Sequence, residues 1–156
     1  MIRAVVDPGV LIAGLITPGG VPAAIIRAWT RGAFELVVSP LLLDELTTTL
    51  LRRKFRRWSS ENDVVAFVEV LRLAAAMVED PAEIEAVSRD PNDDYLIALA
   101  REARAHVLVS SDGDLTSIEG NEPPIVTPRR FLTSLELGGR CGRCRPADNA
   151  RARSGT

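Results

Sequence analysis

Residues 89–100 read Arg-Asp-Pro-Asn-Asp-Asp-Tyr-Leu-Ile-Ala-Leu-Ala, and this stretch predicts a helix that begins with acids and continues with apolar side chains. Asp90 has the N-cap position and Pro91 the first helical position, where the missing N–H is no loss. Asp93 lies on the same helical face as Leu96 and continues the buried stripe at its rim. A carboxylate there is costly to desolvate unless a cation or several donors meet it. The stretch therefore directs attention to other acids that gather beside Asp93.

The composition limits the class of protein. The chain has 156 residues, 46% hydrophobic and 26% charged, which is enough for one domain with one core. No apolar run approaches the roughly 20 residues of a membrane span, and no signal-type segment opens the chain, so we expect a cytoplasmic protein with no membrane partner. The net charge of −2 argues against a general polyanion binder.

Short apolar runs alternate with helical patterns along the chain. Strands are expected at residues 2–6, 34–38, 106–110 and 124–127, with a further short strand at 77–78, and helices at residues 10–16, 21–31, 40–50, 62–77, 91–105 and 128–137. This alternation predicts an α/β protein with three layers, α/β/α, around a mainly parallel four- to five-stranded sheet. The domain is expected to span residues 1–137, and the Arg- and Gly-rich tail at 138–156 to be disordered.

Four acids are predicted to meet at one edge of this sheet. Asp7 and Asp112 directly follow two strands, and sites gather at the carboxyl ends of strands in open α/β sheets. Glu45 and Asp93 lie near the starts of helices at the same edge, with Asp114 close to Asp112. Each acid alone has a simpler explanation as a turn, a cap or, for Glu45, an exposed helix face. Four together repel one another and need a hard cation, and their oxygen ligands suit Mg²⁺ or Mn²⁺.

Two other polar residues near these elements receive separate interpretations. His106 begins a strand at the edge opposite the acids, so a structural role is expected rather than a ligand role. Asp94 aligns with Ala98 and Arg101 on a flank of its helix, and the pattern leaves open whether it shares the role of Asp93.

Residues 52–58 form the sharpest charge run, with two aromatic residues interleaved. Such a run suits phosphate binding and base stacking, and the alternative is a solvated helix end. The candidate RNA-binding residues are Arg52, Arg53, Arg56 and Arg57. The chain contains no Ser-His pair for nucleophilic catalysis, no His cluster for zinc and no Gly-rich loop followed by Lys.

Four segments stand in the order and spacing of a known family. They are Val5-Val6-Asp7 before residues 10–12, Ser39-Pro40 with Glu45-Leu46, residues 89–93 before 96–100, and Ser110-Ser111-Asp112-Gly113-Asp114-Leu115. Over about residues 1–137 the sequence resembles the PIN-domain family and, more narrowly, its bacterial toxin-like branch from toxin–antitoxin pairs. The resemblance places Asp7, Glu45, Asp93 and Asp112 on the family's catalytic acidic quartet, with Asp114 as an accessory position.

The resemblance also implies an activity and partners. It implies a Mg²⁺- or Mn²⁺-dependent endoribonuclease that cleaves RNA and leaves 5′-phosphate products. The implied metal ligands are Asp7, Asp93, Asp112 and Asp114, with Glu45 orienting the attacking water. A homodimer and a small antitoxin protein are the implied partners.

One position departs from the family pattern. A hydroxyl residue and then Asn or Ser usually follow the first aspartate, whereas this chain has Pro8 and Gly9. Pro8 has neither a hydroxyl nor an N–H, so we expect weaker support for Asp7 and an activity that is weak or lost. This departure motivates a second hypothesis, in which the PIN fold captures RNA or an antitoxin peptide without cleaving it.

The two cysteines, Cys141 and Cys144, lie in the tail and exclude a disulfide framework for the domain. Their spacing is that of half a zinc site, but two further ligands are missing nearby. An unpaired, flexible pair is expected, with redox pairing or a zinc site shared between two chains as alternatives.

Overall fold

Strand β1 (Arg3–Val6) forms the middle of the sheet because its side chains are apolar on both faces: Ala4, Val5 and Val6 are at most 1% exposed. The structure is a computed structural model that describes the backbone of residues 1–141 and the side chains of residues 1–138. Five parallel strands have the order β3-β2-β1-β4-β5. The others are β2 (Glu35–Val38), β3 (Ala76–Met77), β4 (Val107–Val109) and β5 (Ile125–Val126).

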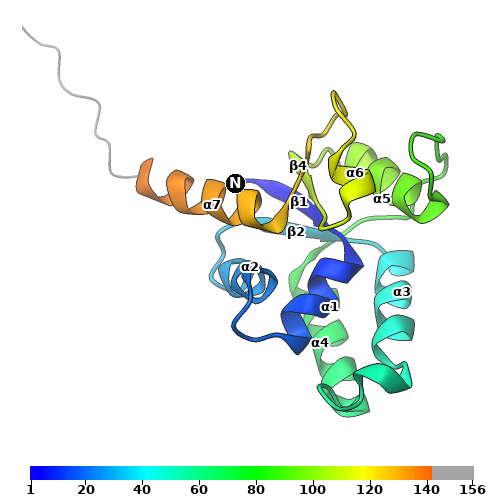
Figure 1. Ribbon diagram of the computed structural model, residues 1–156, viewed down its shortest axis with the longest axis vertical. Helices are drawn as coiled ribbons and strands as arrows, with labels where there is room; N and C mark the ends of the chain where they lie inside the picture. The colour runs from blue at the N-terminus through cyan, green and yellow to red at the C-terminus, as the bar shows by residue number, and fades with distance from the viewer. Residues whose placement is uncertain (142–156) are drawn as a thin grey trace, which may run out of the picture.

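Helices cover both faces of the sheet. They are α1 (Pro8–Ile16), α2 (Val21–Thr30), α3 (Pro40–Leu50), the short 3₁₀ helix η1 (Arg53–Phe55), α4 (Glu61–Ala74), α5 (Pro91–Glu102), α6 (Gly113–Thr116) and α7 (Pro128–Cys141). Figure 1 shows α1 to α4 on one side of the sheet and α5 with α6 on the other. Helix α7 packs on α2, where the Phe131 and Phe34 rings meet edge to face at 5.0 Å. The predicted three-layer fold with a parallel sheet is confirmed.

Three helices start at the carboxyl edge of the sheet with the same device, a polar cap followed by proline. The cap of α1 is Asp7, that of α3 is Ser39 and that of α5 is Asp90. Each cap side chain accepts a hydrogen bond from a backbone N–H of the first turn, and proline fixes a helical φ angle directly after it. The cap and the proline thus determine where each of these helices begins at the edge of the sheet.

Some expected boundaries are wrong. Helix α4 ends at Ala74 rather than Met77, because residues 76 and 77 pair with β2 and Val78 N–H donates to Val38 O. Helix α7 continues to Cys141, beyond the expected end at residue 137, because glycines weaken a helix without having to stop it. The expected disorder of the tail falls, beyond Cys141, outside the described residues, as does Cys144.

No single helix within residues 1–141 is long and apolar enough to cross a membrane. Helices α1 and α2 reach the required apolar length only jointly, and they meet at an angle of 97°.

Candidate active site

The first and fourth acids meet where the strand order reverses, between β1 and β4. Asp7 follows β1, and its Oδ1 accepts from Gly9 N–H at 2.9 Å. Its Oδ2 accepts from the Ser110 hydroxyl at 2.8 Å, and the same Oγ accepts from Asp112 N–H at 3.1 Å. Ser110 is fully buried after β4 and joins the ends of the two strands. This is the switch point at which ligands bind in open α/β sheets.

These contacts correct the expectation that Pro8 and Gly9 weaken the support for Asp7. Ser110, which directly follows the neighbouring strand β4, donates its hydroxyl to Asp7 Oδ2. Gly9 donates its backbone N–H to Asp7 Oδ1. Both carboxylate oxygens of Asp7 are therefore held in place. Ser110 is part of the motif at residues 110–115 that the sequence analysis identified. Its contact with Asp7 could not be predicted without knowing that β4 pairs with β1.

Asp112 caps α6 at the same edge. Its Oδ1 accepts from Asp114 N–H at 2.9 Å, and both Asp112 and Asp114 are exposed to solvent. Because one oxygen of Asp112 is used by the cap, its Oδ2 is the atom that remains for a ligand.

Asp93 is the most perturbed acid of the site. It is 8% exposed, and its side chain makes no hydrogen bond within the described residues. Burial, followed by the negative charges of Asp112, Asp90, Asp7 and Asp114, raises its pKa from 3.8 to about 6. Both effects disfavour the charged carboxylate, so a cation at this position would relieve them.

Glu45 is half-buried on α3 and faces the same acids. Burial and then the charges of Asp7 and Asp90 raise its pKa above the usual value. The interpretation of Glu45 as an exposed surface residue does not describe this environment. The structure thus brings together acids from four separate segments: Asp7, Glu45, Asp93 and Asp112.

Asp90 belongs to this group although the sequence analysis treated it only as a cap. Its Oδ1 accepts from Asn92 N–H at 2.9 Å, and its charge acts on both Glu45 and Asp93. The signal available in the sequence was its place three residues before Asp93, one helical turn away.

Asp94, whose role the sequence left open, has an environment different from that of Asp93. It is 6% exposed, and its Oδ1 accepts from Val87 N–H at 2.9 Å and Ser88 N–H at 2.6 Å. Burial alone would raise the pKa of Asp94, but these donors outweigh it and lower the pKa. Asp94 therefore anchors the linker at residues 79–90, which covers the side of α5.

A second anchor holds the other end of this linker. Tyr95 Oη donates to Asp80 Oδ1 at 2.7 Å and shares a short hydrogen bond with Ser39 Oγ. Leu41 N–H also donates to Asp80 Oδ1, at 3.1 Å. The beginnings of α3 and α5, the helices that carry Glu45 and Asp93, are thereby linked through one polar cluster.

The donor chemistry of the edge fits a divalent hard cation, because carboxylate oxygens predominate and Asp93 is buried near other negative charges. The positions of the acids are more open than a ligand sphere. Within the described residues, no three His, Cys, Asp or Glu side chains lie close enough to hold one ion together. The edge thus matches a divalent cation in the type of its donor atoms, and its acids are spaced more widely than the ligands of one ion.

The predicted RNA-binding arginines lie apart from the acids. The turn that joins α3 to α4 contains all four, at the far end of α3 from the sheet edge (Figure 1). Arg56 pairs with Glu61 at 2.8 Å, and Arg57 lies over the Trp58 ring at 5.5 Å. Trp58 is 54% exposed, so this turn presents an aromatic ring and cations to solvent, which agrees with both interpretations of the charge run.

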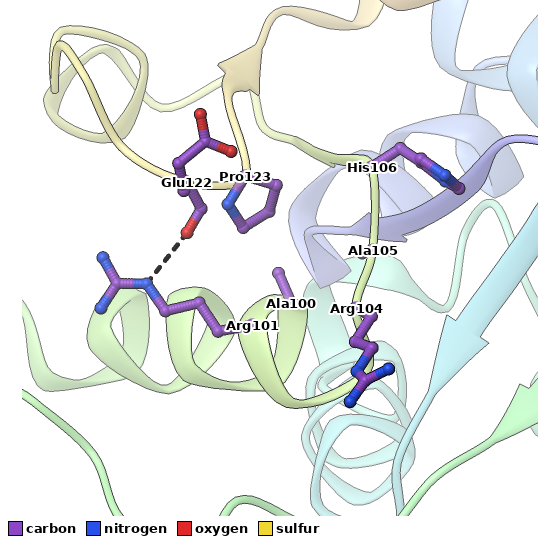
Figure 2. A pocket seen from close by; sticks show the side chains of 7 residues that line it. All are labelled: Ala100, Arg101, Arg104, Ala105, His106, Glu122 and Pro123. Atoms are coloured by element: carbon purple, nitrogen blue, oxygen red, sulfur yellow. Dashed lines mark hydrogen bonds between the residues drawn. The ribbon is translucent and has the colours of Figure 1, made fainter.

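A cavity of about 420 Å³ lies at the opposite edge of the sheet, around Arg101, Arg104 and His106. Figure 2 shows Arg101 bound to the Glu122 carbonyl and the Arg104 guanidinium pointing in another direction, so the two cations do not converge. His106 Nδ1 accepts from Arg3 N–H at 2.9 Å, in agreement with the structural role expected for it.

Comparisons with known proteins agree with this arrangement. An uncharacterised protein of Methanocaldococcus jannaschii, MJ1680, is 25% identical over 145 residues, which are 86% of this chain and 92% of the relative. The crystal structure of PAE2754 from Pyrobaculum aerophilum superimposes with a TM-score of 0.61 and 18% identity. The superposition covers 87% of this chain and 96% of that one, so the two share a fold.

The family assignment comes from a third comparison. Residues 3–114, which include all four acids of the edge, match the PIN domain. PIN domains are in general nucleases that use divalent metal ions. The chain belongs to the PIN-domain family.

Proposed function

We propose that this protein is a Mg²⁺- or Mn²⁺-dependent endoribonuclease that hydrolyses RNA and leaves 5′-phosphate products. The observation that supports this proposal is the meeting of four acids from separate segments at the switch point of the sheet. Two of them, Glu45 and Asp93, have raised pKa values because they are partly buried among other acids. Perturbed acids of this kind are typical of functional sites.

The acids divide into two roles. Asp7, Asp93 and Asp112 would hold the ion, with Asp114 as an accessory ligand. A bound divalent ion lowers the pKa of a coordinated water and polarises the phosphate oxygens. The hydrogen bond from Ser110 already orients the Asp7 carboxylate. The Asp93 carboxylate is available to an ion because it makes no hydrogen bond within the described residues. Glu45 orients the attacking water and accepts its proton at a carboxylate oxygen, for which a raised pKa is favourable.

The finer biological assignment is also a proposal. We propose that the protein is the toxin of a toxin–antitoxin pair, acts in the cytoplasm as a homodimer and is neutralised by a small antitoxin protein. The resemblance of the motifs to the toxin-like branch supports this assignment. Co-expression with the product of the neighbouring reading frame should yield a complex that does not cleave RNA, and an orphan gene would weaken the assignment.

Cleavage of a mixed RNA substrate tests the proposed reaction. Wild-type protein with Mn²⁺ or Mg²⁺ should cut, whereas Asp93→Asn and an EDTA-treated sample should not. Asp44→Asn is the matched control, because Asp44 is an exposed acid next to Glu45 on α3 and its side chain has no partner in residues 1–138. That variant should cut like the wild type.

The same experiment separates the nuclease from the binding module. If folded, antitoxin-free wild type and Asp93→Asn are equally silent on the mixed RNA but both bind it, the protein captures RNA without cleaving it. Cleavage that persists in EDTA and in Asp93→Asn would contradict the carboxylate–metal mechanism.

A further inference from the structure

A cavity of about 360 Å³ lies between the linker before α5 and the short helix α6. It is lined by Val87, Ser88, Arg89, Asp114, Ser117 and Ile118. Its volume falls within the range of small-ligand sites. Unlike the cavity of Figure 2, it is lined by two segments that adjoin the acid cluster: the linker that leads to Asp90, and the α6 segment that contains Asp114.

The cavity adjoins the acid cluster, because one acid belongs to both. Asp114 forms part of its wall and is also one of the charges that act on Asp93. Arg89, on the opposite segment, directly precedes Asp90, whose charge acts on both Asp93 and Glu45. A strand whose phosphate lies at the acids would therefore place its neighbouring nucleotide at this cavity.

Both walls are held by internal hydrogen bonds. On the linker, Asp94 fixes the amides of Val87 and Ser88, and Ser88 Oγ donates to Asp90 O at 2.8 Å. Directly after α6, Ser117 Oγ donates to Asp114 O at 3.1 Å. A site whose walls are already ordered binds a ligand without the entropy cost of ordering them.

The lining matches the three parts of a nucleotide. Arg89 is exposed and has no hydrogen bond or ion pair within the described side chains, so its guanidinium is available to a phosphate. The Ser117 hydroxyl, whose proton is used within α6, still has lone pairs that can accept from a ribose hydroxyl. Val87 and Ile118 provide half-buried apolar surface for a base.

We propose that this cavity is the subsite for the nucleotide next to the scissile phosphate of a single-stranded RNA, with the flanking phosphate on Arg89 and the sugar and base between the linker and α6. The inference rests on the proposed function, because it names the part of the RNA substrate that lies beside the acids. It also separates two basic regions: Arg89 binds next to the reacting phosphate, and the arginines of the α3–α4 turn lie at a distance.

Binding measured without metal tests the subsite apart from cleavage. The probe is a fluorescently labelled, short single-stranded RNA in EDTA, followed by anisotropy over a series of salt concentrations. Arg89→Ala should weaken binding about fivefold, the effect of one charge-assisted contact, and should reduce the slope of log K against log salt by about 0.7. Arg89→Lys should restore the slope. Ser117→Trp, which fills the cavity, should weaken binding and leave the slope unchanged.

Arg31→Ala is the matched control, because it removes the same charge from an exposed arginine that follows α2 at the opposite edge of the sheet. It should bind RNA like the wild type. Thermal melting of every variant checks that the fold is kept. Affinity and slope unchanged in Arg89→Ala, together with unchanged binding by Ser117→Trp, would overturn the subsite, as would a wild type that does not bind the RNA.

Cleavage assays with Mn²⁺ keep this inference distinguishable from the proposed function. A wild type that cuts RNA while Arg89→Ala keeps its KM overturns the subsite alone. A wild type that never cuts, but loses RNA affinity on Arg89→Ala, supports the subsite and overturns the nuclease. Equal binding of a single-stranded DNA of the same sequence overturns the assignment of the sugar contact to RNA.

Discussion

Ser110 Oγ donates a hydrogen bond to Asp7 Oδ2 at 2.8 Å, although 103 residues separate them in the chain. The contact joins the ends of β1 and β4, and the same oxygen accepts from Asp112 N–H. One buried hydroxyl therefore fixes the first acid and the segment that carries the fourth acid.

Ser110→Ala should lower both activity and stability. It leaves a carboxylate oxygen of Asp7 and the N–H of Asp112 without their partner, which costs about 1–3 kcal/mol in the free energy of unfolding. If Asp7 binds the metal ion as proposed, loss of the hydroxyl that orients it should lower metal affinity or activity roughly 10- to 100-fold. Ser111→Ala, at an exposed neighbour whose side chain has no hydrogen bond in the described part of the chain, is the control. Cleavage rates and thermal melts provide the measurements, and equal behaviour of the two variants would argue against the role of Ser110.

The raised pKa of Asp93 predicts a pH-dependent penalty on stability. The folded carboxyl keeps its proton up to about pH 6, whereas the unfolded one loses it near 3.8. The folded state therefore binds more protons within this window, and this group lowers the free energy of unfolding as the pH rises through it.

Asp93→Asn removes that penalty. In EDTA it should melt at a higher temperature than the wild type near neutral pH. At about pH 3 the two should melt at nearly the same temperature, because Asp93 is then mostly protonated in both the folded and the unfolded state. Mn²⁺ should raise the melting temperature of the wild type more above pH 6 than below it, because the ion competes with the proton. A melting difference that does not change with pH would show that repulsion at Asp93 is not its cause.

Asp94→Ala should loosen the linker rather than the cluster of acids. The amides of Val87 and Ser88 lose their acceptor, at a cost of about 1–3 kcal/mol, and should exchange hydrogen faster. Asp94→Asn keeps an acceptor oxygen and should have a smaller effect. Because the folded pKa of Asp94 is lowered, its stabilisation is present at neutral pH and lost as the pH falls through that pKa. Unchanged exchange at residues 87 and 88 in the alanine variant would contradict the anchor.

Gly14→Ala should destabilise the packing of α1 on α2. A Cβ at this position would overlap Ile26 Cδ1 and lie 3.1 Å from the Pro22 backbone. Overpacking costs about 1–3 kcal/mol, which exceeds the gain of at most about 1 kcal/mol in helix propensity. Gly9→Ala tests the same helix without the clash, because its Cβ would meet only Asp7 Oδ1 at 3.5 Å. Chemical denaturation should give a lower midpoint for Gly14→Ala alone; equal midpoints would mean that Ile26 and Pro22 yield without cost.

Charge reversal tests whether the turn between α3 and α4 guides RNA. Arg53→Glu should weaken RNA binding and flatten its salt dependence by roughly one phosphate contact, and Arg31→Glu should not. Both residues are exposed, so neither change should affect the fold. RNA affinity that is the same in both variants would leave this turn as a solvated helix end.

The order of the elements could be predicted because its signals are local. Proline after a polar cap marks the starts of α1, α3 and α5, and β-branched runs mark the strands. The approach of Asp7 to Asp112 also followed from the sequence, because the carboxyl ends of parallel strands share one edge.

Other features depend on tertiary packing that no local pattern encodes. The position of Asp94 on its helix predicted a flank, but the linker at residues 79–90 covers that flank and buries the carboxylate. The support of Asp7 by Ser110 required knowing that β4 is the neighbour of β1. The sequence showed Asp90 only as a helix cap. Its electrostatic effect on Glu45 depends on the distance between the starts of α3 and α5, which no local pattern indicates.

The order of the strands in the sheet has a consequence for the synthesis of the protein. The chain makes β1 first, yet the partner that fixes Asp7 comes from β4, more than one hundred residues later. Asp112 and Ser110 leave the ribosome together, after Glu45 and Asp93. A growing or truncated chain that lacks β4 therefore holds an incomplete set of acids and an unsupported Asp7. If the protein cleaves RNA as proposed, the messenger from which it is being translated is protected until the domain is almost complete.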